Sequence, residues 1–393
     1  TGALRAKKTP PLTCPPGEPA TFALTNLLAD TRYFYQVLYR PEAGPETTSP
    51  VFSFHTQRKK GQPFTFTVQA DSHLDANTDP QVYLRTLSNA VADQPDFHVD
   101  LGDTFMSDKH KTREGAFQQY LAQRYYFGQI APSAPLFLVL GNHDGEAGRW
   151  TDGTTNSLAA WSNFQRKRFF PCPVPDSFYT GNDRPFPPSG LLENYYAWEW
   201  GDALFIVLDP FWYTNRKKGS DDNWTATLGK EQYDWLAKTL ESSRAPYRFV
   251  FIHHLVGGLG KDSRGGIEAA PFFEWGGKNA DGTDGWKANR PGWALPIHEL
   301  LVKHRVNAVF HGHDHLFAHQ ELDGITYQTL PQPGHPRGEP RSAEEYGYTH
   351  GTILPGSGHL RLKVDPEKTG VEFVRSTGDD APALAHRYEL RPK

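Results

Sequence analysis

Five short polar clusters, each placed directly after an apolar run with strand character, most restrict what this 393-residue chain can fold into. In an open α/β sheet, the carboxyl ends of parallel strands share one edge, and ligands bind outside that edge. Clusters that each follow a strand are therefore expected to meet there, although they lie far apart in the chain. The clusters are Asp71-Ser72-His73, Gly102-Asp103, Gly141-Asn142-His143-Asp144, His253-His254 and His311-Gly312-His313-Asp314-His315.

Strand-like and helix-like runs alternate from Phe64 onward, which predicts an α/β domain. The spacing of apolar residues predicts helices over 80–93, 115–127, 230–242 and 295–304. Buried-type strands are predicted over 64–70, 96–101, 136–140, 195–200, 203–208, 248–252 and 306–310. Short runs at 316–320, 325–329, 359–364 and 370–375 predict an added, mostly antiparallel second sheet. Two long stretches, 145–194 and 255–294, look irregular but are rich in aromatic residues, so we expect ordered loops that cover the site.

Residues 1–60 have a different character and are predicted to form a small all-β sandwich module. Alternating or β-branched runs predict strands over 21–27, 31–39 and 51–56, with Pro, Gly and Asp in the connections. The polar segment Arg58-Lys59-Lys60-Gly61 is expected to be a hinge. The predicted domains are therefore 1–60, the β module, and 61–393, the catalytic domain.

Composition excludes several classes of partner. The net charge is −4, so no general attraction to nucleic acid or to an anionic membrane is expected. No run approaches the roughly 18 consecutive apolar residues of a membrane-spanning helix. The chain opens at Thr1 and its one methionine is Met106, which indicates a processed or trimmed chain. The scarcity of cysteine and methionine fits export, and a secreted or periplasmic location is expected. Two separate thiols, or one disulfide that ties the N-terminal tail to the main body, are both compatible with Cys14 and Cys172.

The residue types in the five clusters predict a metal centre. Imidazole, carboxylate and amide oxygen together suit borderline and hard divalent cations, and the clusters contain no thiol. Two residues apart on an extended strand end, Asp71 and His73 would point to the same side, and so would His313 and His315. These two pairs, with Asp103, Asn142 and one further histidine, exceed what a single tetrahedral ion needs. Seven ligands with a shared carboxylate fit two ions about 3.5–4 Å apart.

Taken in order, the clusters resemble the calcineurin-like metallophosphoesterase superfamily, whose motif runs D-x-H, G-D, G-N-H-[DE], H, G-H-x-H. The resemblance implies two facing mixed β-sheets flanked by helices. It also implies one metal held by Asp71, His73, Asp103 and His315, and a second held by Asp103, Asn142, His253 and His313. His253 is preferred to His254 in the fourth block because it directly follows its predicted strand. His143 then corresponds to the catalytic histidine that contacts substrate and aids the leaving group, and Asp144 is expected to orient it.

The resemblance implies a metal-dependent phosphoric ester hydrolase that acts on a small-molecule phosphate ester. Two divalent or trivalent ions, such as Fe, Mn or Zn, would supply a bridging hydroxide that attacks phosphorus in line. An alternative is a phosphodiesterase acting on nucleotide or lipid-type diesters. A more remote one is a non-catalytic extracellular binding protein.

The N-terminal module resembles the fibronectin-like domain that precedes the catalytic domain of purple acid phosphatases, on the residues from Leu27 to Val37. One block departs from that subfamily, whose G-D-x-x-Y tyrosine binds ferric iron. Here the block reads Gly102-Asp103-Thr104-Phe105-Met106, and His73 is present where those enzymes lack a histidine. We therefore expect the general site of the superfamily and no tyrosinate ligand.

Overall fold

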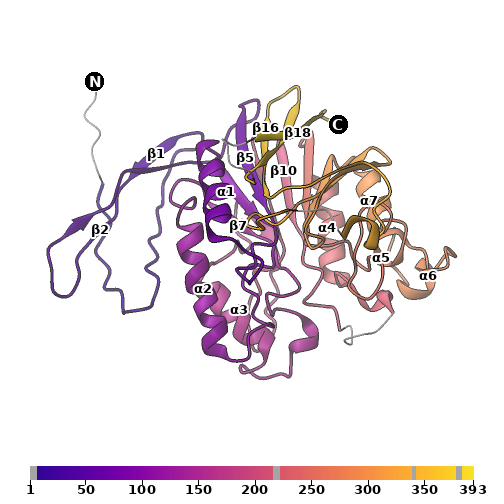
Figure 1. The fold of residues 1–393 in the computed structure, drawn as a ribbon, viewed down its shortest axis with the longest axis horizontal. Helices are drawn as coiled ribbons and strands as arrows, with labels where there is room; N and C mark the ends of the chain where they lie inside the picture. Colours follow the sequence, from indigo (N-terminus) through magenta and orange to yellow (C-terminus); the bar gives the residue numbers. More distant parts are fainter. Residues whose placement is uncertain (1–6, 216–221, 339–341, 378–382) are drawn as a thin grey trace.

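Two β-sheets lie face to face and are flanked by helices in the computed structural model, which describes residues 7–215, 222–338, 342–377 and 383–393 (Figure 1). The first sheet has six strands in the order β18-β17-β16-β5-β6-β7. Its strands β5, β6 and β7 are parallel, and β16, β17 and β18 extend it in antiparallel fashion. Their bounds are β5 (Phe64–Gln69), β6 (Phe97–Asp100), β7 (Leu136–Leu138), β16 (Gly358–Val364), β17 (Thr369–Arg375) and β18 (Ala383–Leu390).

The second sheet has eight strands in the order β15-β13-β14-β12-β11-β10-β9-β8. Its centre, from β10 through β11 and β12 to β14, is parallel, and antiparallel strands close both edges. Their bounds are β8 (Thr180–Gly181), β9 (Tyr196–Trp200), β10 (Ala203–Val207), β11 (Tyr247–Phe251), β12 (Ala308–His311), β13 (Phe317–Leu322), β14 (Ile325–Thr329) and β15 (Thr352–Leu354).

The main core lies between the two sheets and is built largely from aromatic rings. Phe66 of the first sheet packs edge to face on Phe205 of the second, with ring centroids 5.2 Å apart, and both are fully buried. Rings in this arrangement add about 0.5–1.5 kcal/mol beyond the apolar area that they bury. The core holds the sheets in one orientation and so sets where their strand ends meet.

Helices cover the outer faces of both sheets, α1, α2 and α3 on one flank and α4, α5 and α7 on the other (Figure 1). Helix α1 begins where Asp79 caps it, because the carboxylate accepts hydrogen bonds from the backbone N–H groups of Gln81 and Val82 and Pro80 opens the first turn. The helices are α1 (Pro80–Ala92), α2 (Arg113–Phe127), α3 (Leu158–Phe169), α4 (Lys230–Ser242), α5 (Phe273–Gly276), α6 (Trp286–Asn289), α7 (Ile297–Lys303) and α8 (Ser342–Glu345), with 3₁₀ turns η1 (Gly148–Trp150) and η2 (Asn223–Thr225).

The N-terminal segment extends away from the two sheets (Figure 1). It forms two short antiparallel ladders, β1 (Arg32–Tyr35) with β4 (Phe52–His55), and β2 (Leu38–Tyr39) with β3 (Thr47–Thr48). Residues 21–27 lie outside the strands, so the strand predicted there is wrong. Apolar side chains such as Phe34, 64% exposed, are left uncovered on these ladders, so the described strands do not pack into a closed sandwich. The division at residue 60 stays a prediction.

The predicted two-sheet α/β fold is confirmed, but the expected second sheet of late strands is wrong. The runs near 316–329 became β13 and β14 and joined β12, whereas β16 and β17 joined β5 of the first sheet. The stretch 145–194 is also less irregular than expected, because it contains α3 and η1.

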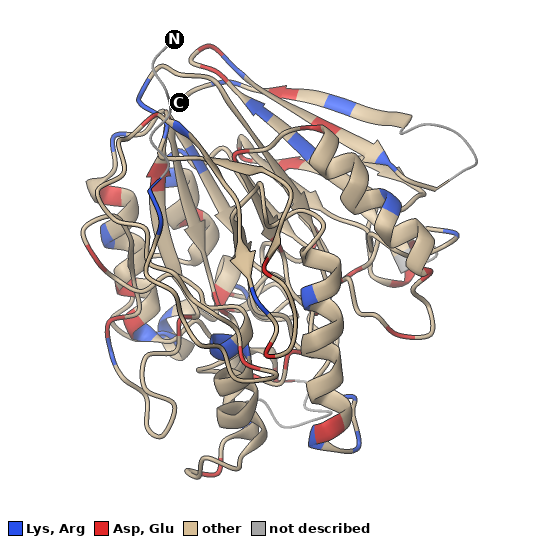
Figure 2. Ribbon diagram, turned by 90° about the vertical axis from the view of Figure 1, so that its left-hand side faces the viewer, with Lys and Arg blue, Asp and Glu red and all other residues tan. Residues whose placement is uncertain are grey.

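Segments of both charge signs are interspersed over the ribbon, in keeping with the small net charge (Figure 2). Within the described part of the chain, none of the helices combines the length and the apolar character that a bilayer crossing requires.

Candidate metal centre

The five polar clusters follow the ends of β5, β6, β7, β11 and β12, as predicted. Within each sheet, the backbone joins these loops directly. The amide of Asp71 donates to the carbonyl oxygen of Gly102 at 3.0 Å, and the amide of Gly312 donates to that of His253 at 3.0 Å. Because the core packs the two sheets against each other, their strand ends form one common edge, and the clusters of both sheets meet at this edge.

The prediction that Asp71 and His73 point to the same side of an extended strand end is wrong, because neither residue lies on extended backbone. Asp71 has φ 58° and His73 has φ 49°, which places both in the left-handed region. Asp103, His313 and His315 share this conformation, with φ of 55°, 69° and 57°. Non-glycine residues rarely adopt it, and strain of this kind of about 1–3 kcal/mol per residue gathers at functional sites. Tight turns, and not strand alternation, bring these side chains together.

At two positions in the motifs, neighbouring atoms lie so close to the backbone that only glycine fits. A Cβ atom on Gly141 would lie 2.0 Å from the backbone nitrogen of Asp103, and one on Gly312 would lie 2.3 Å from Oδ2 of Asp71. Any side chain at either position would push a candidate ligand out of place.

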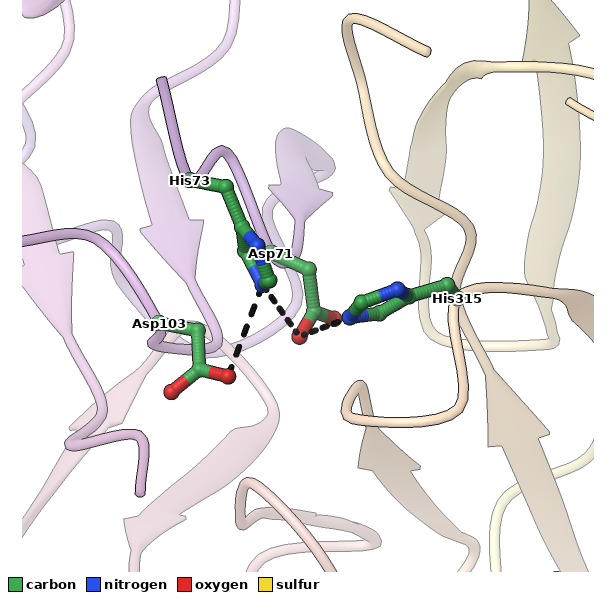
Figure 3. Close-up of side chains that lie close together, drawn as sticks. All are labelled: Asp71, His73, Asp103 and His315. Atoms are coloured by element: carbon green, nitrogen blue, oxygen red, sulfur yellow. Dashed lines mark ion pairs between the residues drawn. The ribbon is translucent and has the colours of Figure 1, made fainter. Parts of the chain in front are cut away.

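The first group of candidate ligands contains Asp71, His73, Asp103 and His315, whose ligand atoms all lie within 4.8 Å of one another (Figure 3). Oδ1 of Asp71 lies 3.4 Å from Nε2 of His315 and 3.8 Å from Nε2 of His73. Nε2 of His73 lies 3.5 Å from Oδ2 of Asp103. Three of the four side chains are buried, and His315 is about one-third exposed.

The second group contains Asp103, His253 and His313, and all three are buried. Nε2 of His253 lies 3.4 Å from Oδ2 of Asp103 and 3.1 Å from Oδ1 of Asn142, so the amide oxygen joins this group. All seven predicted ligands are therefore brought together, and Asp103 belongs to both groups. His254 lies beside the second group, with its ring centroid 5.0 Å from that of His313, but is not part of it.

Hydrogen bonds behind the histidines set which ring nitrogen faces the site. Nδ1 of His253 lies 2.7 Å from the carbonyl oxygen of Leu101, and Nε2 of His313 lies 2.6 Å from that of Asp262. A carbonyl only accepts, so these nitrogens carry protons and the opposite nitrogens are the ones left to bind a metal ion. The Asp75 carboxylate, 3.2 Å from Nδ1 of His73, acts in the same way.

The electrostatics of the site favour a bound cation. Burial alone would lower the pKa of His253, but the attraction of the Asp103 carboxylate outweighs it and raises the pKa to about 9. Burial would raise the pKa of Asp103, yet His253 and His143 hold it well below its ordinary value. Nε2 of His73 is buried beside two carboxylates without a hydrogen-bond partner. Buried carboxylates that attract positive charge, with lone pairs aimed at them, fit a divalent metal site.

His143 lies at the edge of this centre, its ring centroid 6.2 Å from that of His73. Its backbone amide donates to Oδ1 of Asp103 at 2.8 Å, and its Nδ1 lies 3.0 Å from both oxygens of Asp108. The expectation that Asp144 orients the His143 ring finds no support in these contacts.

Asp144 instead holds the backbone of two loops. Its carboxylate accepts hydrogen bonds from the amides of Gly141, Asp103, Thr104 and Phe105 at 2.7–3.2 Å. Burial and the nearby Asp103 charge raise its pKa to about 7.

Sequence reasoning missed Asp75 and Asp108, although each lies a few positions after a predicted ligand. It also missed Arg264, which comes from the 255–294 stretch and contacts His313 and Asp314. The two cysteines are free thiols, Cys14 exposed and Cys172 partly buried, so the disulfide alternative is not supported.

Comparison with known proteins agrees with this geometry. The family model described as calcineurin-like phosphoesterase matches residues 64–317, which contain every candidate ligand. No curated protein matches the chain.

Two solved structures resemble the fold. Purple acid phosphatase PPD1 from yellow lupin (Lupinus luteus) seeds has a TM-score of 0.60 and 16% identity, covering 93% of this chain and 60% of that one. The structure of PhoD has a TM-score of 0.61 and 16% identity, covering 92% and 76%. At these identities the likeness concerns the fold alone, whereas the matched family model spans more than half of the chain. The chain therefore belongs to the calcineurin-like phosphoesterase family and is a metal-dependent phosphoesterase of the hydrolase class.

Proposed function

We propose that this chain hydrolyses phosphate esters with two metal ions bound side by side at the common strand edge. The observation that carries the proposal is that the Asp103 carboxylate belongs to both groups of candidate ligands. Oδ2 of Asp103 faces both groups, 3.5 Å from Nε2 of His73 and 3.4 Å from Nε2 of His253, so this one oxygen can lie between two cations, and its charge offsets part of their mutual repulsion. A single ion would leave one of the two groups without a role.

Asp71, His73, Asp103 and His315 would hold the first ion, and Asp103, Asn142, His253 and His313 the second. When bound, the ions lower the pKa of coordinated water and neutralise charge on the phosphate oxygens. The oxygen- and nitrogen-only ligand set suits Mn²⁺, Zn²⁺ or iron.

His143 is the proposed proton donor to the leaving group. The Asp108 carboxylate accepts a hydrogen bond from Nδ1 of His143, so Nε2 is the nitrogen left to exchange a proton with substrate.

The substrate would be a small-molecule phosphate ester, a view that the names of the structural neighbours support. We also propose a secreted or periplasmic location, since cysteine and methionine are scarce, with two and one residues. Fractionation of cells that express the natural gene tests the location.

The activity is tested with p-nitrophenyl phosphate and bis(p-nitrophenyl) phosphate in parallel. Hydrolysis should disappear after treatment with a chelator and return with Mn²⁺ or Zn²⁺. The ratio of the two rates separates phosphatase from phosphodiesterase. Failure of both substrates in metal-loaded protein that binds two ions would favour a non-catalytic role.

A further inference from the structure

A tight hairpin from Leu259 to Arg264 leaves the second sheet and returns to the metal centre. The amide of Leu259 donates to the carbonyl of Arg264 at 2.7 Å, and the amide of Arg264 donates to that of Leu259 at 2.9 Å. Gly258 lies so close behind the turn that a Cβ there would be 2.2 Å from the carbonyl carbon of Ser263. The hairpin is thus short, closed by two hydrogen bonds and held from behind.

This hairpin contacts both the side chain and the backbone of His313. The carbonyl oxygen of Asp262 lies 2.6 Å from Nε2 of the His313 ring. Nη1 of Arg264 donates to the backbone carbonyl of His313 and lies 3.3 Å from Oδ1 of Asp314. Ring and backbone of His313 are therefore held by the same six-residue turn.

The residue after His313, Asp314, is also held in place, and its side chain is 2% exposed. Its Oδ2 accepts from the amide of Gly265 at 2.8 Å and from the hydroxyl of Tyr348 at 2.7 Å. The Arg264 guanidinium lies over the ring of Tyr346, 4.7 Å from its centroid. The loops around Arg264 and Tyr348, which are far apart in the sequence, thus both contact the turn that carries His313.

We propose that the 259–264 hairpin is a positioning element for the second metal ion, and that it sets the affinity of that ion by holding Nδ1 of His313 toward Asp103 and His253. This inference rests on the proposed two-metal function. The physical reason is that a ligand already fixed in its binding rotamer and tautomer loses little freedom when the ion binds. His315, by contrast, is one-third exposed and lies in the first group, so the hairpin should matter less to the first ion.

The test compares Arg264→Met with Arg290→Met. Arg290 is a matched control, because it lies in the same 255–294 stretch and contacts a buried carboxylate, Glu274, at 2.5 Å, together with the carbonyls of Trp224 and Ala226. Among the described residues, the hydrogen bonds and ring contacts of Arg290 do not reach the His313 loop. Metal-free protein is titrated with Co²⁺, and its visible absorption and bound metal content are followed.

Wild-type protein and Arg290→Met are expected to bind two Co²⁺ ions tightly. In Arg264→Met the first ion should bind unchanged, and the second should bind about 10–100-fold more weakly with altered absorption bands, as is typical when a group that orients a ligand is lost. Arg264→Lys should recover part of the affinity, because it restores one donor to the His313 carbonyl.

Equal affinity for both ions in Arg264→Met and wild type would overturn the inference, and so would the same loss in Arg290→Met. Fewer than two ions in wild-type protein would instead overturn the proposed function. If Arg264→Met does not fold, Tyr348→Phe decides in its place, since it removes only the hydroxyl that donates to Asp314. The second ion should then bind more weakly than in wild type, and unchanged binding of both ions would count against the hairpin.

Discussion

Both carboxylate oxygens of Asp108 lie 3.0 Å from Nδ1 of His143. The pair joins two loops, one after β6 and one after β7, and the amide of Asp108 also donates to the carbonyl of His143. A carboxylate in this position fixes the tautomer and the orientation of the ring. It is therefore Asp108, and not the neighbouring Asp144, that is placed to orient the proposed proton donor.

Asp108→Asn is expected to lower kcat by about 10–100-fold on an alkyl phosphate, because such a leaving group needs a proton. The loss on p-nitrophenyl phosphate should be much smaller, since p-nitrophenolate leaves without one. His143→Ala should show the same pattern with a larger loss, of about 10²–10⁴-fold, and the double variant should be little worse than His143→Ala alone. Steady-state kinetics on the two substrates check this. An equal loss on both substrates, or a loss of bound metal, would contradict the assigned role.

Asp144→Ala is expected to act on stability and not on proton transfer. Removal of this buried carboxylate leaves four backbone amides of two loops without an acceptor, which should lower the free energy of unfolding by about 3 kcal/mol. Asp108→Ala serves as the matched control and should cost less than about 1 kcal/mol. Urea unfolding of the metal-free proteins measures both values. Equal losses of stability in the two variants would contradict the structural role assigned to Asp144.

Asp103→Ala is expected to remove both metal ions, because its carboxylate belongs to both groups of ligands. His315→Ala belongs to the first group only and should leave one ion bound. The measurement is metal content after dialysis against a low concentration of Mn²⁺. Retention of one ion in Asp103→Ala would mean that the carboxylate is not shared.

Local periodicity and short motifs were enough to predict helices α1, α2, α4 and α7, most central strands of both sheets, and the seven candidate ligands that the fold brings together, but they missed α3 and placed a strand at 21–27 that the fold lacks. They did not predict how the late strands divide between the sheets. Pairing β16 with β5 joins Leu362 to Phe66 across most of the chain, and no local pattern encodes that choice.

The residues that the sequence did not reveal were missed for one common reason. Asp108 and Arg264 act through contacts between loops, and an acidic or basic residue in a loop looks the same whether it meets solvent or a ligand. The backbone carbonyl of Asp262, which fixes the His313 ring, has no signature in the sequence at all. Motif spacing therefore finds the ligands themselves, whereas the groups that orient them require the fold.

A histidine pair that links the two sheets should make stability depend on pH. Nδ1 of His319 on β13 lies 3.1 Å from Nε2 of His386 on β18, and the His319 ring stacks on Tyr388 with centroids 3.7 Å apart. Burial, with a further contribution from His386, lowers the pKa of His319 from 6.5 to about 4. Oε1 of Glu321 lies 3.9 Å from Nε2 of His319.

Because the pKa of His319 is depressed in the folded state, its contribution to stability is complete above pH 6.5 and is lost as the pH falls toward 4. At about pH 5 the unfolded chain should therefore bind close to one proton more at this residue than the folded chain does. His319→Phe keeps the stacking on Tyr388 and removes this titration. Urea unfolding of the metal-free proteins between pH 7 and pH 4.5 should give a shallower fall in stability for the variant than for wild type. Parallel curves would mean that His319 takes up its proton equally well in the folded protein, and that the contact between the sheets does not exclude it.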